Sequence, residues 1–113
     1  MQTELRTDSD VAIVDLRGRL VAGEAVDSLR TVINQLVADD WKKILLNLSE
    51  VDWIDSSGIG ELVGSIKLAK RFSGAIKLLR IGDRVRHVLS ISKLLPVLDV
   101  YEDEQEALAS FDS

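Results

Sequence analysis

Apolar residues recur along this chain with two periods, one typical of strands and one typical of helices. The segments 2–6 and 11–16 have the short apolar and β-branched character of strands, and the polar turn 7–10 separates them. A polar turn between two strand segments favours a β-hairpin. We therefore expect the fold to open with a hairpin.

The next segment, residues 24–38, has apolar residues at intervals of three and four, which predicts an amphipathic helix. These residues are Val26, Leu29, Val32, Ile33, Leu36 and Val37. After a polar break, residues 43–48 are almost continuously apolar, as in a strand that is covered on both faces. We expect this segment to be the central strand of a sheet.

The pattern of a helix followed by a strand then repeats. Apolar positions at helical spacing begin just after the serine pair 56–57 and stop near Gly74, where a left-handed cap is expected. The segment 75–81 has strand character, and Asp83 is a plausible N-cap for a third helix. A turn around Pro96, a short strand and a closing helix complete the chain.

This order, β-β-α-β-α-β-α-β-α, predicts an α/β fold. We expect one domain over residues 1–113, in which about four α-helices pack on a mixed β-sheet of about four or five strands. With 113 residues, of which 46% are hydrophobic, the chain is long enough to bury a core of its own.

Charge and composition exclude several classes of function. The net charge of −5 argues against direct binding of nucleic acid, which depends on neutralising phosphates. No apolar run approaches the ~18 residues of a membrane span, the N-terminus has no signal-peptide pattern, and there are no cysteines. We expect a cytoplasmic protein without membrane insertion. Eight basic residues between 67 and 93 form either a solvated face or a docking surface.

The stretch Asp55-Ser56-Ser57 concentrates the unusual choices of the sequence, because two serines lie where a helix is expected to begin. Either serine could cap that helix, since serine is among the preferred N-cap residues. The same position also suits a phosphate, because a helix N-terminus carries free N–H groups and partial positive charge. A phosphoserine there would add about −1.5 to −2 charges beside Asp55.

Two glycines inside this helix, Gly60 and Gly64, each cost roughly 0.5–1 kcal/mol relative to alanine. They serve either close packing of the helix on the sheet or the approach of another protein's backbone. Periodicity alone leaves both uses open.

Three other chemistries find weak support. The Gly58–Gly64 segment outlines a dinucleotide-binding turn, but the following strand does not end in an acidic residue that could bind a ribose. His87 is the sole histidine, and Ser56 does not lie in the elbow motif of serine hydrolases. Asp52 and Asp55 do not form a zinc ligand cluster. We expect neither a cofactor nor a metal, and no enzymatic activity.

The segment Leu46-Asn47-Leu48, followed by Val51-Asp52-Trp53-Ile54-Asp55-Ser56-Ser57-Gly58-Ile59-Gly60, closely resembles the signature of STAS-domain anti-sigma factor antagonists. The likeness extends to the opening hairpin, to Gly18-x-Leu20 and to the closing helix. It implies that a partner, both anti-sigma factor and serine kinase, phosphorylates Ser56. It also implies that the unmodified protein binds this partner and frees a sigma factor, and that a phosphatase acting on phospho-Ser56 resets the switch.

By the same resemblance, Asp55 orients the serine or adds to repulsion, Ser57 caps the helix, and Gly58 and Gly60 admit the partner. The expected partner-binding residues are Asp55, Ser56, Ser57, Gly58, Ile59, Gly60, Arg19 and Val21. The loop Arg19-Leu20-Val21 departs from the acidic residues that many members carry there, so charge pairing with a kinase is expected to differ. The alternatives are a constitutive STAS subunit, for instance of a lipid-transport ATPase, or a nucleotide-binding protein.

Overall fold

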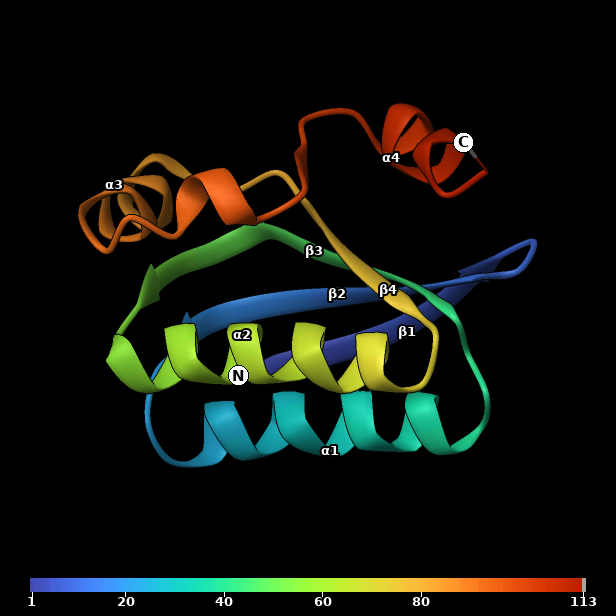
Figure 1. The fold of residues 1–113 in the computed structure, drawn as a ribbon. Helices are drawn as coiled ribbons and strands as arrows, with labels where there is room; N and C mark the ends of the chain where they lie inside the picture. The colour runs from blue at the N-terminus through green and yellow to red at the C-terminus, as the bar shows by residue number, and fades with distance from the viewer. Residues whose placement is uncertain (113) are drawn as a thin grey trace.

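A five-stranded sheet in the order β1-β2-β3-β4-β5 is the frame of the computed structural model, which describes residues 1–112 (Figure 1). The strands are β1 (Gln2–Asp8), β2 (Val11–Leu20), β3 (Lys43–Ile54), β4 (Ala75–Leu79) and β5 (Val100–Tyr101). The helices are α1 (Glu24–Ala38), α2 (Ser56–Arg71), α3 (Asp83–Ile91) and α4 (Glu104–Ser110), with the 3-10 helix η1 (Leu95–Val97) before β5.

The sheet is mixed, because β1 pairs antiparallel with β2 while all other neighbouring strands are parallel. The predicted order of elements, the opening hairpin and the central position of β3 are confirmed. β3 continues to Ile54, beyond the apolar run that predicted it, and pairs with the last residues of β2. This extension carries the start of α2 to the far end of the sheet.

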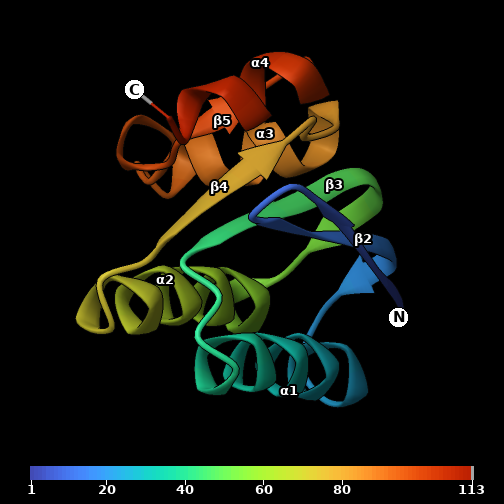
Figure 2. The same cartoon turned by 90° about the vertical axis from the view of Figure 1, so that its right-hand side faces the viewer.

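Helices cover both faces of the sheet: α1 and α2 lie side by side on one face, while α3 and α4 lie on the other side (Figures 1 and 2). The alternation of side chains along the strands explains why α1 and α2 lie opposite α4. Val14 and Leu46 belong to the core cluster that includes Leu29 and Leu62 of α1 and α2, whereas Ile13 and Leu45 pack with Ala107 of α4.

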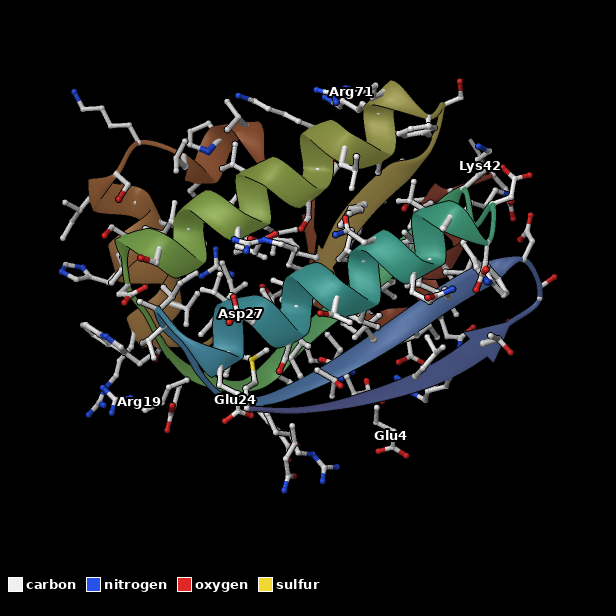
Figure 3. The ribbon with its side chains drawn as sticks, turned by 90° about the horizontal axis from the view of Figure 1, so that it is seen from below. Glu4, Arg19, Glu24, Asp27, Lys42 and Arg71 are labelled. Carbon is white, nitrogen blue, oxygen red and sulfur yellow. The ribbon has the colours of Figure 1, made fainter. Side chains whose placement is uncertain are left out.

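An ion pair joins α1 and α2 across their exposed boundary. The guanidinium of Arg30 donates from Nη2 to Glu61 Oε1 at 2.8 Å, and only 11% of the Glu61 side chain is exposed. Figure 3 shows the two helices running alongside each other on this face. The pairing supports the position of α2 relative to α1.

Two expected caps are wrong. The N-cap of α3 is Gly82, so Asp83 is the first helical residue and makes no side-chain cap. After α2 the left-handed residue is Ser73, with φ 66°, and not Gly74. A Cβ at Gly74 would lie 3.0 Å from the carbonyl oxygen of Lys42, so close packing explains this glycine. Among residues 1–112, no helix is long and apolar enough to cross a membrane.

Candidate functional site

The site is built where β3 ends and α2 begins, and Asp55 is the residue between them. Asp55 is the N-cap of α2: its Oδ1 accepts a hydrogen bond from the backbone N–H of Gly58 at 2.9 Å. Its Oδ2 accepts a second from the N–H of Ala22, in the loop between β2 and α1, at 3.1 Å. The Asp55 backbone N–H also donates to the carbonyl of Leu20, at 3.3 Å. One aspartate therefore fixes the helix start to the neighbouring loop.

The expectation that a serine caps α2 is wrong. Ser56 and Ser57 are the first two helical residues, and the capping side chain belongs to the residue before them. Aspartate is as good an N-cap as serine, so local sequence alone could not decide between the three positions. The role assigned to Ser57 passes to Asp55.

The hydrogen bonds to Asp55 also keep its carboxylate charged. Donation by Gly58, then by Ala22, lowers the pKa of Asp55 below its usual range. This follows from elementary electrostatics, because N–H groups that donate to the ionised form stabilise that form. A negative charge therefore stays fixed beside Ser56.

Both serines are exposed, and their hydroxyl groups make no hydrogen bond within the part of the chain that the structure describes. The Ser56 hydroxyl stands at the end of α2 where backbone N–H groups lack helical partners and the helix dipole is positive. A kinase would find this hydroxyl accessible, and the same N–H groups would favour an added phosphate.

The three glycines of this region have different roles. Gly58 is buried, and a Cβ there would collide with the carbonyl oxygen of Leu20 and lie 2.8 Å from Ile54 Cγ1. Gly60 and Gly64 are exposed, and a Cβ at either would meet no atom within 4 Å. Packing of helix on sheet thus explains Gly58, but it does not explain Gly60 or Gly64.

The segment Arg19-Leu20-Val21, whose sequence departs from the family pattern, lies at the same end of the sheet as the serines. Arg19 and Leu20, at the end of β2, pair in register with Trp53 and Ile54, at the end of β3. Arg19 is exposed (Figure 3), Leu20 is buried and Val21 is partly buried. The structure thus brings Arg19 and Val21 to the same end of the sheet as Asp55.

Ile59 and Gly58, like Asp55, contribute to the fold as well as being expected partner-binding residues. Ile59 is partly buried and packs against the core, and Gly58 lies against Leu20. Sequence reasoning had not singled out Trp53, which is 38% exposed at the end of β3. The available signal was an aromatic residue two positions before the N-cap.

The structure adds no support for a serine-hydrolase site, a metal site or a dinucleotide-binding turn. His87 is exposed on α3, and no hydrogen bond joins it to Ser56 in residues 1–112. Those residues also contain no group of three histidine or acidic side chains that could hold a metal. Gly58 is already the third residue of α2, so the glycine string lies in a helix rather than in a strand-to-helix turn.

The basic residues between 67 and 93 fall into two groups. Three bind the C-terminal segment: Lys77 Nζ donates to the carbonyl of Ser110 at 3.0 Å, while Arg80 and Arg86 both bond Glu102. The other five are exposed and form no ion pair among the described residues. They are Lys67, Lys70, Arg71, Arg84 and Lys93. Three of the eight basic residues therefore bind the C-terminal segment of the chain.

Comparison with known proteins identifies the family. Residues 2–107 match the STAS domain. This chain belongs to the STAS domain family. A STAS relative, the anti-sigma F factor antagonist of Paenibacillus polymyxa, is 26% identical over 113 residues, covering 99% of this chain and 96% of the relative.

Two solved structures share the STAS fold. A proposed anti-sigma factor antagonist from Thermotoga maritima superposes with a TM-score of 0.89 at 25% identity, covering 98% of this chain and 95% of the other. The Bacillus cell fate determinant SpoIIAA, in its phosphorylated form, gives a TM-score of 0.74 at 24% identity, with 97% and 99% covered. The resemblance inferred from the motif is thus confirmed.

Proposed function

We propose that this STAS protein is an anti-sigma factor antagonist whose activity is controlled by phosphorylation of Ser56. In its unmodified form it binds an anti-sigma factor that is also a serine kinase, and so frees a sigma factor. Phosphorylation of Ser56 by this partner releases it, and a phosphatase restores the binding form. The protein acts in the cytoplasm as a binding partner, without catalysis, nucleic-acid contact or a cofactor of its own.

The observation that carries the proposal is the exposed Ser56 hydroxyl beside a carboxylate that is already fully engaged. Both oxygens of Asp55 accept backbone hydrogen bonds, from Gly58 and Ala22. The cap therefore does not depend on the serine, and modification of the serine removes no hydrogen bond of the fold. A switch residue needs this independence, because the domain must stay folded in both states.

The phosphate would act through local electrostatics. It would bring about −1.5 to −2 charges next to the ionised Asp55, on a helix end whose N–H groups partly compensate them. The domain tolerates this charge because the site is exposed. An acidic or apolar partner surface packed on the same spot would not tolerate it, because the charge would lose its hydration there.

The partner surface in this proposal continues from Ser56 along the exposed side of α2. Gly60 and Gly64 leave this side bare, so another backbone can approach the helix closely. Arg19 and Trp53 pair in register at the ends of β2 and β3, and both are exposed at the end of the sheet where α2 begins. Because Arg19 is basic, we expect the part of the partner that faces it to be acidic.

A kinase reaction tests the assignment of the site. The protein is incubated with ATP and each kinase-type anti-sigma factor of its host, and the modified residue is mapped by mass spectrometry. Wild type and Ser57→Ala should gain one phosphate, on Ser56, and Ser56→Ala should gain none. Stable binding of a host partner without any phosphorylation would instead support the constitutive STAS subunit.

A second variant tests the surface. Gly60→Arg places a long side chain in open space on α2, so the fold should persist while binding of the anti-sigma factor is lost. The matched control is Asn34→Arg, at an exposed position of α1. Binding of Gly60→Arg with the affinity of wild type would remove α2 from the proposed interface.

A further inference from the structure

The two edges of the sheet differ strongly. At one edge, β5 has only two residues, and both are partly buried. At the other edge, all seven residues of β1 are exposed, and no element of residues 1–112 covers its outer side (Figure 3). A long, open edge strand offers a row of unpaired N–H and C=O groups to another strand.

The hairpin shows which backbone groups of β1 point outward. β1 and β2 are joined by the two-residue turn Ser9-Asp10, and Asp8 pairs with Val11. The residues that flank a two-residue turn exchange both hydrogen bonds, and the pairs alternate from there. Thr3, Leu5 and Thr7 therefore direct their N–H and C=O groups away from β2.

The sequence of β1 is complementary to itself when a second copy runs antiparallel and the pairing is centred on Leu5. Each side chain then faces a suitable partner. The resulting pairs are Gln2 with Asp8, Thr3 with Thr7, Glu4 with Arg6, and Leu5 with Leu5 of the second copy. Leu5, at the centre of this pairing, directs its N–H and C=O groups outward. The register that matches the side chains is therefore also one in which the two strands can form hydrogen bonds.

The charged pair is the most specific part of this match. Arg6 is held in place by Asp15, with Nε to Oδ2 at 2.6 Å, and by Glu104 at 2.6 Å, yet 40% of its side chain remains exposed. Glu4 is exposed and forms no ion pair within residues 1–112. Charges on an edge strand usually oppose pairing. Here they oppose a parallel or shifted register and favour the antiparallel one.

We propose that β1 pairs with β1 of a second copy of this chain, forming a two-fold dimer with one continuous sheet. The symmetry is that of an isologous interface, in which the same patch serves both subunits. A shallow groove between β1 and α1 adjoins this edge. Thr3 of β1 lines it together with Ser28, Thr31, Val32, Gln35 and the acidic Glu24 and Asp27 of α1. The Leu5 side chains, 52% exposed in one copy, would cover each other.

The dimer would leave the serine site free. Ser56 follows β3, and β2 lies between β3 and the paired edge. Because the two β1 strands run in opposite directions, the two Ser56 sites would lie at opposite ends of the joint sheet. Such a dimer presents two partner-binding sites at once, and each is accessible to a separate partner molecule.

Light scattering coupled to gel filtration tests the proposal on the full chain. Wild type at up to about 0.5 mM should give a mass of twice 12.5 kDa, falling toward the monomer on dilution. Glu4→Lys should be monomeric, because Lys would face Arg6 twice across the two-fold axis. Leu5→Pro should also be monomeric and folded, since the proline removes an N–H that points outward and is tolerated on an edge strand.

The matched control is Glu106→Lys, the same change of charge on the exposed surface of α4. It should remain dimeric, and circular dichroism should show the same fold for all variants. A wild-type mass of one chain at the highest concentration would overturn the proposal. So would a dimer that persists in both Glu4→Lys and Leu5→Pro.

Discussion

The Asp55 carboxylate accepts a hydrogen bond from the backbone N–H of Ala22 at 3.1 Å, although 33 positions separate the two residues along the chain. The contact joins the start of α2 to the loop between β2 and α1. It ties the backbone at Ala22 to the residue that precedes Ser56. The proposed partner surface around Ser56 therefore rests on backbone that is held by hydrogen bonds before any partner binds.

Replacing Asp55 by alanine should loosen both segments at once. Asp55→Ala removes the acceptor for the Gly58 and Ala22 N–H groups, so the midpoint of thermal unfolding should fall. Amide hydrogen exchange should accelerate at Gly58 and also at Ala22. Ser57→Ala is the control, because the Ser57 hydroxyl makes no hydrogen bond in the described chain, and its midpoint should match wild type. A larger loss in Ser57→Ala than in Asp55→Ala would refute the assigned cap.

Acid should weaken this cap. The hydrogen bonds from Gly58 and Ala22 lower the pKa of Asp55, so its charged form stabilises the fold above the unfolded pKa of about 4. That contribution is lost as the pH falls through the lower, folded pKa. The stability difference between wild type and Asp55→Asn, measured by urea unfolding, should therefore be largest near neutral pH and shrink below about pH 4. The pKa of Asp15, which accepts hydrogen bonds from Arg6, is lowered as well, so acid also weakens the fold at Asp15. Comparing wild type with Asp55→Asn isolates the contribution of Asp55.

Replacing each of the three glycines of α2 by alanine should distinguish the glycine that is needed for packing from the two that face open space. Gly58→Ala forces a Cβ against the Leu20 carbonyl, and we expect it to lower the free energy of unfolding by about 1–3 kcal/mol. Gly60→Ala and Gly64→Ala add a methyl group in open space, and each should raise stability by roughly 0.5–1 kcal/mol. Chemical denaturation of the three variants gives the comparison. Stabilisation by Gly58→Ala would contradict the described contact.

The alternation of apolar patterns was enough to predict the elements of the fold. The helical spacing between residues 24 and 38 and the apolar runs at 43–48 and 75–81 correspond to α1, β3 and β4. Parallel strands that are buried on both faces appear in the sequence as continuous apolar runs. Parallel neighbours need a crossover connection, so a helix is expected between them. The motif also identified the family, because its residues follow one another along the chain.

What sequence reasoning missed depends on contacts between distant segments. Asp55 could not be chosen over the serines, because its second bond goes to Ala22, in another loop. The need for glycine at 58 arises from Leu20, and the need for glycine at 74 arises from Lys42. Whether Gly60 and Gly64 are exposed depends on how α2 is rotated about its axis on the sheet. The periodicity of apolar residues does not determine that rotation.

The most direct test of the proposed switch is the affinity of the kinase-type anti-sigma factor for two forms of this protein. Isothermal titration would compare the unmodified protein with protein carrying phosphate on Ser56 alone, as verified by mass spectrometry. The proposed switch predicts tight binding of the unmodified form and a loss of about 100-fold or more, roughly 2.7 kcal/mol, on phosphorylation. Equal affinity of the two forms would contradict it.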